Sequence, residues 1–395
     1  MIKIFYHKLY SFLRKTQKYT KTDNVYLVKY GSWLTLGQII SSICSFLLAL
    51  VFANLLPKET YGIYKYILSI ASLLTIPTLA GINTAVIQAV SRGYEGSLVK
   101  GLKIRIRWGI FGTLASIGLA GYYYFNDDLT LTISFLIIAV FIPLIESFDI
   151  YNTVLIGRKL FNIHTKYISL VRILSVSAII ITLFFTNNLL LIIFAYFFSY
   201  TLFRFIFLLL TLKKFSLNKK EDPQTISYGK HLSLINVFNT IANYLDKILI
   251  FHYLGAIELA IYSFAVIPPE QLKGFLKNIS SLALPKLSTK TTKEIKNTIS
   301  RKMIILGLFV GIGIIIYIFL APYFYKIFFP QYLESVFYSQ IFSISLITIV
   351  TILPETALRA KMAKKQLYQL NIFSPIVQII LLFLFIICIS YRKTL

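Results

Sequence analysis

Eleven long apolar runs constrain the fold of this 395-residue chain more than any other feature of the sequence. A transmembrane helix needs about 20 predominantly apolar residues, and every run reaches that length. Short polar connections separate the runs and leave no room for a folded soluble domain. Backbone polar groups in hydrocarbon must be paired internally, and no barrel-like alternation is present, so the sequence predicts an all-α polytopic membrane protein. The runs cover approximately residues 31–52, 62–90, 104–125, 129–156, 163–185, 188–212, 230–253, 257–284, 302–321, 332–357 and 367–391.

The basic residues carry a topology signal. The formal net charge is +25, from 40 Lys and Arg against 15 Asp and Glu. Such an excess can indicate nucleic-acid binding, but most of these residues fall in alternate connections between the apolar runs. Positively charged connections stay in the cytoplasm, so the pattern predicts a cytoplasmic N-terminus and argues against a nucleic-acid partner. An odd number of crossings would place the C-terminus outside, beside Arg392 and Lys393.

The first 29 residues form a separate basic segment without the apolar core of a cleavable signal peptide. Ile2, Phe5, Leu9 and Phe12 fall on one helical face, and basic residues occupy the others. This arrangement is typical of an interfacial helix on an anionic inner leaflet. A basic tail without fixed structure fits the same composition, and both interpretations remain open.

An internal repeat divides the chain. The segment that begins at Tyr30 aligns without gaps with the segment that begins at Tyr228, and nine of 35 positions are identical. Six crossings separate the two copies, so both enter the membrane from the same side. We therefore expect two parallel pseudo-repeated lobes around a central cavity, a design known from transporters. The predicted parts are an N-lobe over 30–212, a cytoplasmic linker over 213–227 and a C-lobe over 228–395.

The two repeats share a polar stripe along their first helix. Residues spaced by three and seven positions fall on one face of a helix. Such stripes on both helices predict a shared hydrated substrate pathway, although interhelical hydrogen bonding would use the same residue types. The stripe consists of Gln38, Ser41 and Ser45 in the first copy and of Asn236, Asn239 and Asn243 in the second.

The N-lobe places four charged residues at one depth in the membrane. Glu146 and Asp149 share a face of the fourth run, and Arg172 and Arg204 lie at a similar distance from the cytoplasm. A buried Arg presents a planar fork that suits carboxylate or phosphate oxygens. The two arginines are candidates for binding an anionic head group, and the two acids are candidates for coupling or gating. Pairing among the four groups is the structural alternative.

The stretch "YLDKILIF" places Asp246 and Lys247 side by side within the seventh run. A charge at the centre of a membrane helix costs about 2.5–3.5 kcal/mol on insertion scales. Neighbours on a helix point in different directions, so the two are not expected to pair with each other. Asp246 extends the polar stripe and is a candidate for coupling or gating, with an interhelical hydrogen bond as the alternative. Lys247 is a candidate for the substrate pathway.

The eighth run combines two prolines with a charged face. Pro268 and Pro269 interrupt the hydrogen-bond ladder of this run, and such breaks often line cavities. Glu270, Lys273 and Lys277 then follow on one face. The acid is a further candidate for gating and the two lysines for the substrate pathway. Glu270 and Lys273 could also pair internally, and Lys277 could extend to the inner surface.

The sequence contains no constellation typical of an enzyme. Cys44 and Cys388 lie within apolar runs, the four histidines lack ligand spacing, and no Gly-rich phosphate loop occurs. The predicted external connections are only several residues long. We therefore predict neither an enzyme nor a metal or cofactor site.

Two stretches carry a family resemblance. "YLDKILIFHYLGAIELAIYSFA" resembles the seventh-to-eighth helix signature of the polysaccharide-transport family, the O-antigen and capsule repeat-unit flippases. "ANLLPKETYGIYKYILSIASLLTIPTLAGINTAVIQAVSR" resembles their first-to-second helix stretch. The family belongs to the multidrug/oligosaccharidyl-lipid/polysaccharide exporter superfamily. The resemblance extends from about residue 25 to the end of the chain.

The resemblance implies twelve or more helices in two lobes and a bacterial cytoplasmic membrane. It implies that an undecaprenyl-diphosphate-linked oligosaccharide is moved from the inner to the outer leaflet by alternating access. It also implies H⁺ or Na⁺ as a coupling ion, and a polysaccharide polymerase or other glycan-assembly proteins as partners. Only one crossing follows residue 366, so the twelfth helix of the family is not found in this chain.

The family carries basic residues in its central cavity. This chain matches them by location and not by motif, at Arg172, Arg204, Lys247, Lys273 and Lys277. A diphosphate that crosses hydrocarbon needs compensating positive charge, which makes a lipid-linked oligosaccharide flippase the leading hypothesis. A cation-coupled exporter of small cationic compounds from the same superfamily is the first alternative, and it predicts acids in the cavity. A membrane scaffold for glycan-assembly enzymes is the second.

Overall fold

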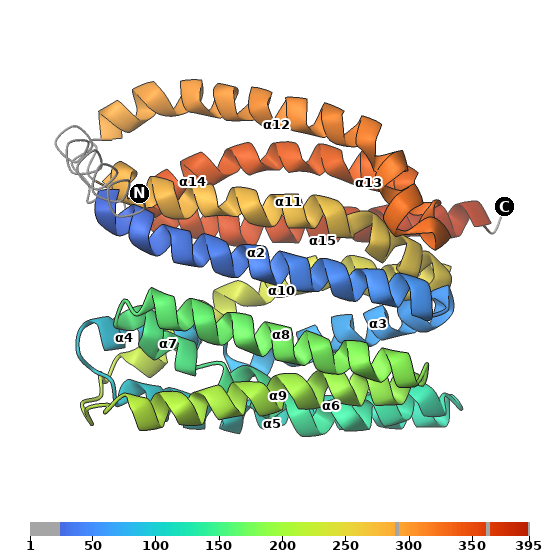
Figure 1. The fold of residues 1–395 in the computed structure, drawn as a ribbon, viewed down its shortest axis with the longest axis horizontal. Coiled ribbons are helices and arrows are strands. Elements are labelled where there is room, and N and C mark those ends of the chain that lie inside the picture. Colours follow the sequence, from blue (N-terminus) through green and yellow to red (C-terminus); the bar gives the residue numbers. More distant parts are fainter. Residues whose placement is uncertain (1–23, 289–291, 361–363, 394–395) are drawn as a thin grey trace, which may run out of the picture. The chain divides into compact units, whose positions relative to one another are not determined.

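The structure is a computed structural model that describes residues 24–288, 292–360 and 364–393 (Figure 1). Within these ranges the regular secondary structure is entirely helical. The basic segment over 1–29 lies largely outside the described residues, and its predicted interfacial helix stays a prediction. The helices are α2 (Asn24–Leu55), α3 (Lys58–Leu74), η1 (Ile76–Thr78), α4 (Gly81–Ser91), α5 (Ser97–Phe125), α6 (Leu129–Phe148), α7 (Tyr151–Gly157), α8 (Phe161–Phe185), α9 (Leu189–Lys214), α10 (Thr225–Leu254), α11 (Ala256–Ser288), α12 (Thr292–Phe328), η2 (Pro330–Tyr332), α13 (Ser335–Ile344), η3 (Ser345–Thr351), α14 (Ile352–Ala360) and α15 (Lys364–Lys393).

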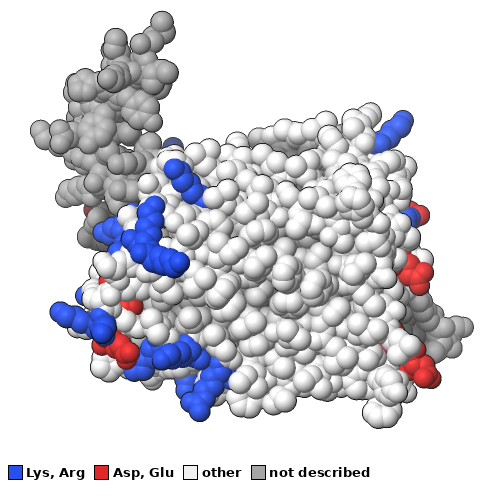
Figure 2. All heavy atoms as spheres, turned by 60° about the horizontal axis from the view of Figure 1, so that its bottom comes forward, with Lys and Arg blue, Asp and Glu red and all other residues white. Residues whose placement is uncertain are grey.

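These helices confirm the prediction of an all-α polytopic membrane protein. Each of the eleven apolar runs coincides with one helix or with a chain of shorter helices. Among the described residues, six helices are long and apolar enough to cross a bilayer, and up to seven if the bent pair formed by 58–78 and 81–91 counts as one span. Large apolar side chains cover the outside of several of them, for example Phe185, Phe319 and Val140. On the face drawn in Figure 2, uncharged side chains cover most of the surface and Lys and Arg gather along one margin.

The second apolar run is broken where the sequence predicts a single crossing kinked at Pro77. Helix α3 and helix α4 meet at an angle of 48° across the short helix η1. Pro77 lies in η1, and Leu79 adopts a left-handed conformation with φ of 56°. Two side chains bond to the broken backbone. Arg105 donates from Nε to the carbonyl of Thr78 at 3.0 Å, and Ser233 accepts from the N–H of Gly81 at 3.0 Å. These bonds satisfy backbone groups that a helix would pair internally.

The eighth run was expected to be interrupted, but the structure shows it as a continuous helix. Helix α11 continues through Pro268 and Pro269 as one helix from Ala256 to Ser288. The expected interruption is therefore confined to the hydrogen bonds that the two prolines cannot donate. Neighbouring groups in membrane bundles often tolerate such losses without a change of helix direction.

The chain divides into two compact units. One consists of Met1–Ser42 and Phe264–Leu370, and the other consists of Ile43–Ser263 and Asn371–Leu395. In the first, α12 packs on α13, η3 and α14 around Val310, Ile314, Leu346 and Ile349. In the second, α5 and α6 form a close hairpin, α8 packs on α9, and α10 packs on α3 and α4. The division into an N-lobe and a C-lobe with a linker over 213–227 remains a prediction.

Helices α4 and α10 are in close contact at two glycines, Gly81 of α4 and Gly229 of α10. A Cβ atom added to Gly229 would lie 2.8 Å from Cα of Ile82, and one added to Gly81 would lie 2.6 Å from the carbonyl oxygen of Gly229. Small residues at such crossings allow backbones in membranes to come close. Gly229, which aligns with Gly31 in the internal repeat, therefore has a packing role in the second copy.

The segment between α9 and α10 is bonded to the turn between α4 and α5. Glu95 accepts from Nε of Arg158 at 2.6 Å and from the N–H of Asn218 at 3.0 Å. Asp222 binds Arg92, and the N–H of Asp222 donates to Ser97 at 3.0 Å. The Arg158 hydrogen bond, together with the Asn218 N–H, holds the pKa of Glu95 below its ordinary value. These bonds fasten the connecting segment to the ends of three helices.

Candidate functional site

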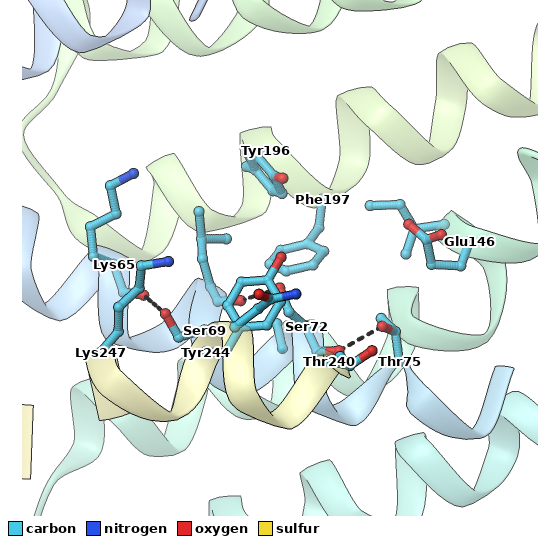
Figure 3. Close-up of a pocket in the computed structure, with 14 residues that line it drawn as sticks. Lys65, Ser69, Ser72, Thr75, Glu146, Tyr196, Phe197, Thr240, Tyr244 and Lys247 are labelled. Atoms are coloured by element: carbon cyan, nitrogen blue, oxygen red, sulfur yellow. Dashed lines mark hydrogen bonds between the residues drawn. The ribbon is translucent and has the colours of Figure 1, made fainter. Parts of the chain in front are cut away.

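A cavity of about 520 Å³ lies in the second unit, between α3, α6, α9 and α10 (Figure 3). Its lining combines two lysines, one carboxylate, a row of hydroxyl groups and three aromatic rings. Helix α3 provides one wall, and α10, the first helix of the second repeat, provides another. The labelled residues of the lining are Lys65, Ser69, Ser72, Thr75, Glu146, Tyr196, Phe197, Thr240, Tyr244 and Lys247.

Lys65 and Lys247 occupy the same end of this cavity, whereas Glu146 lies towards the other end (Figure 3). Nζ of Lys65 lies 5.3 Å from the ring centre of Tyr61, and Nζ of Lys247 lies 5.0 Å from the ring centre of Tyr244. A ring face attracts an ammonium group and leaves donors of that group directed away from the ring. Two cations from different helices therefore reach one cavity with donors available to a ligand.

The hydroxyl groups of α3 form a row along the cavity. The hydroxyls of Ser69, Ser72 and Thr75 donate to backbone carbonyls of their own helix at 2.7–2.8 Å. Thr240 of α10 donates in the same way to Asn236 at 3.0 Å. Since their protons are engaged, these oxygens present acceptor lone pairs to the cavity. Hydroxyl donors of a ligand would find matching partners along this wall.

Glu146 belongs to a buried charge network behind the cavity. Arg204 donates to Oε1 of Glu146 at 3.0 Å and lies 3.5 Å from Oδ1 of Asp149. Arg105, a fully buried side chain of α5, lies 3.9 Å from Oε2 of Glu146. Two carboxylates and two guanidinium groups balance one another, as groups taken out of water require. The single carboxylate in the lining is therefore already compensated by arginines.

Arg172 does not join this network. It donates to the hydroxyl of Tyr200 at 2.7 Å and to Oγ of Ser45 at 2.6 Å. Ser45 is a member of the predicted polar stripe of α2, so this part of the stripe lies against a guanidinium group. Both of these partners are neutral hydroxyl groups, so the two bonds do not compensate the charge of Arg172 beside α2.

The remaining predicted residues lie at several places. Asn243 lines the cavity together with Lys247, whereas Asp246 accepts from the hydroxyl of Tyr262 at 2.5 Å and from the N–H of Lys247 at 2.8 Å. Asp246 thus binds a neighbouring helix, as one of its two interpretations expects, and its role in coupling stays a prediction. Asn236 is exposed and Asn239 is half-buried on α10.

The predicted residues on α11, together with Gln38 of α2, belong to the first unit. Glu270 and Lys273 lie 3.6 Å apart, the geometry of an internal pair one turn along the helix. Gln38 lies beside Gly274, where an added Cβ atom would be 3.2 Å from its Nε2. Lys277 is part of α11, but its side chain lies outside the described residues. A place for these residues in a substrate pathway remains a prediction.

Sequence reasoning missed two basic residues of this site, Lys65 and Arg105. Lys65 was available as an isolated lysine inside an apolar run, the signal that identified Lys247. Arg105 lies inside the third run. It precedes Asp127, in the turn between α5 and α6, by as many residues as Asp149 follows it. A hairpin of α5 and α6 brings such positions to one level, so their pairing follows from the hairpin geometry.

The fold is similar to that of solved multidrug transporters. An inward-facing multidrug resistance MATE family transporter of the MOP superfamily matches with a TM-score of 0.64, at 11% identity over 85% of this chain and 84% of that chain. An outward-facing conformation of such a transporter matches with a TM-score of 0.58, at 14% identity over 88% and 86%. A MOP superfamily transporter from Pyrococcus furiosus, described as having a binding pocket of reverse polarity, matches with a TM-score of 0.53, at 13% identity over 92% and 96%.

The sequence profile of the family described as "Polysaccharide biosynthesis protein" matches residues 27–289. The chain belongs to this family, which confirms the resemblance found in the sequence. An uncharacterized membrane protein of Methanocaldococcus jannaschii is 25% identical over 307 residues, which are 69% of this chain. The chain spans 60% of the length of that relative. Together with the membrane-crossing helices, these matches define a multi-pass membrane protein of the polysaccharide biosynthesis family.

Proposed function

We propose that this chain moves an undecaprenyl-diphosphate-linked oligosaccharide, such as an O-antigen or capsule repeat unit, from the inner to the outer leaflet of a bacterial cytoplasmic membrane. One observation carries the proposal: Lys65 and Lys247 reach one end of a single cavity, and the only carboxylate of the described lining is compensated by arginines. The cavity therefore offers uncompensated positive charge to a ligand. A diphosphate needs such charge when it leaves water.

The rest of the lining suits a saccharide. The hydroxyl row of α3 offers acceptors, Asn243 offers an amide, and Tyr196, Phe197 and Tyr244 offer ring surfaces. Binding sites for small molecules combine apolar walls with a few placed polar groups in this way. Lysine is also a flexible point charge, so Lys65 and Lys247 can follow a phosphate group as the cavity changes shape.

Movement across the membrane follows in this proposal from alternating access with a cytoplasmic N-terminus. The support is the fold shared with transporters described in inward-facing and outward-facing conformations. H⁺ or Na⁺ is the proposed coupling ion, with Glu146, Asp149 and Asp246 as the carboxylates that could exchange it. A polysaccharide polymerase and other glycan-assembly proteins are the proposed partners.

A cation-coupled multidrug exporter is the second candidate, because similar solved structures are multidrug transporters. Such an exporter attracts cations, whereas Lys65 and Lys247 repel them. The charge of the cavity therefore favours the anionic substrate.

The test reconstitutes the full chain in liposomes with a fluorescent undecaprenyl-diphosphate saccharide. A membrane-impermeant reductant quenches the label in the outer leaflet, so the rate of quenching reports movement. We expect Lys65→Gln combined with Lys247→Gln to slow this movement about tenfold or more, the effect of losing at least one charged contact. Lys65→Arg with Lys247→Arg should retain most of the rate, and Lys166→Gln, an exposed lysine on α8, should leave it unchanged. Export of a cationic dye without movement of the labelled lipid would replace the proposal with the multidrug alternative.

A further inference from the structure

A second cavity, of about 290 Å³, lies in the second unit and is almost entirely apolar. Its walls come from the break between α3 and α4, from α5 and from α10. We call it the break groove, and its lining consists of Ile76, Pro77, Leu79, Trp108, Phe111, Ser233, Leu234 and Val237. Trp108, Phe111 and Leu234 are exposed on the outside of the helices. The groove is therefore open to the surroundings of two membrane-crossing segments.

A cation lies at the rim of the break groove. Nζ of Lys230, in the second turn of α10, is 4.9 Å from the ring centre of Trp108. Arg107 and Lys103 are exposed on the same helix as Trp108. The helix starts of α5 and α10 lie near each other, because the N–H of Gly96 donates to the carbonyl of Lys220 at 2.9 Å. Lys230 thus places a positive charge beside an apolar groove, the combination of charge and polarity that suits an anionic lipid.

We propose that the break groove binds an anionic phospholipid of the bilayer, with an acyl chain along Pro77, Phe111 and Val237 and the phosphate at Lys230. Trp commonly lies at the boundary between head groups and acyl chains, and the ammonium donors that point away from its ring suit phosphate oxygens. Basic residues near the inner leaflet attract anionic lipids in general. The apolar groove beneath Lys230 adds a specific place for the chain of one such lipid.

The proposed lipid would contact the one part of α3 and α4 that is not regular helix. Pro77 and the left-handed Leu79 form the inner wall of the groove, and Ser233 in the same wall bonds to the N–H of Gly81. A bound acyl chain therefore packs against the break itself. The site is separate from the cavity of Lys65 and Lys247, and it stands independently of the substrate proposed above.

The experiment uses the two tryptophans of the chain, Trp33 and Trp108. Trp33→Phe leaves Trp108 as the only indole, and lipids brominated on their acyl chains quench indole fluorescence on contact. The full chain with Trp33→Phe is placed in vesicles of phosphatidylcholine that contain either brominated phosphatidylglycerol or brominated phosphatidylcholine. We expect the anionic lipid to quench Trp108 more strongly at equal content, which gives a relative association constant above one.

Three added substitutions decide the proposal. Lys230→Gln should bring the relative association constant for phosphatidylglycerol close to one, because the charged contact that discriminates between the two lipids is lost. Lys166→Gln, at the matching position of α8, should keep the preference. Val237→Phe fills the groove and should lower quenching by both lipids, with circular dichroism as the check that the helices persist. Equal quenching by both lipids, or a preference that survives Lys230→Gln, would overturn the proposal.

Discussion

Arg204 of helix α9 donates a 3.0 Å hydrogen bond to Oε1 of Glu146, so the carboxylate that reaches the cavity is bound to a side chain of another helix. The same guanidinium group lies 3.5 Å from Asp149 and donates to the carbonyl of Ile145 at 2.7 Å. One arginine thus joins α9 to the C-terminal end of α6 through two acids and the backbone. It also compensates the negative charge of Glu146, which would otherwise offset the positive charge of Lys65 and Lys247 in the cavity.

We expect Arg204→Met to destabilise the protein by about 3–5 kcal/mol, because it leaves buried carboxylates without their partner. The midpoint of thermal unfolding in detergent measures the loss. Arg172→Met is the matched control, because within the described part of the chain Arg172 donates hydrogen bonds to the hydroxyl groups of Ser45 and Tyr200. This substitution should cost about 1–3 kcal/mol. Equal losses from the two substitutions would contradict a structural role for the Arg204 network.

Asp246 provides a second stability prediction, because it accepts from the hydroxyl of Tyr262 at 2.5 Å. A double-mutant cycle with Asp246→Asn and Tyr262→Phe should give a coupling free energy of about 1 kcal/mol or more, as expected for a hydrogen bond to a charged group. The unfolding midpoints of the four proteins measure this coupling. Additive effects of the two substitutions would show that the bond does not stabilise the protein.

A separate transport measurement tests the role of Asp246 in coupling. In the liposome experiment, Asp246→Asn should lower the rate of lipid movement and its response to an ion gradient. Tyr262→Phe keeps the carboxylate and is the control for the lost hydrogen bond. Unchanged transport by Asp246→Asn would leave Asp246 with a structural role alone.

The pair formed by Glu95 and Arg158 gives a pH dependence. The pKa of Glu95 is lowered in the folded protein, first by the hydrogen bond from Arg158, so the stabilising contribution is complete above the ordinary value of about 4.3. This contribution is lost as the pH falls through the lower folded value, because the unfolded chain binds the proton more readily. We expect the unfolding midpoint to fall with acidification in that window. Glu95→Gln should lower stability at neutral pH, and its curve should converge with that of the unchanged protein in acid.

The matched control for this pH series is Glu59→Gln, which removes an exposed carboxylate at the start of α3. It tests for a general effect of losing one acidic group. Parallel curves for Glu95→Gln and the unchanged protein, without convergence in acid, would contradict the predicted linkage.

The helices were predictable because length and apolar composition alone specify a membrane-crossing segment. Pro77 indicated a kink in the second run, but the full break between α3 and α4, with its left-handed Leu79, was not predictable. Its irregular backbone is stabilised by Arg105 and Ser233, which come from other helices. Local sequence does not show which distant side chains will bond to it.

Contacts in the site were predictable where the depth of a residue in the membrane alone determined its partner. Glu146, Asp149 and Arg204 were expected at one level, and the structure brings them together. Arg172 shares that level but turns to Ser45 and Tyr200, because the rotation of a helix about its axis decides which neighbour a side chain meets. That rotation follows from packing among several helices, and a single sequence does not fix it.

Gly229 offers a test of the close contact between α4 and α10. A Cβ atom there would lie 2.8 Å from Cα of Ile82, and the backbones cannot separate without disturbing the hydrogen bond from Gly81 to Ser233. We expect Gly229→Ala to destabilise the protein by about 1–3 kcal/mol through overpacking. Gly121→Ala on α5 is the control, because no atom lies within 4 Å of its added Cβ and alanine is the better helix former by about 1 kcal/mol. Unfolding midpoints should therefore move in opposite directions, and a stabilising Gly229→Ala would contradict the packing described for these two helices.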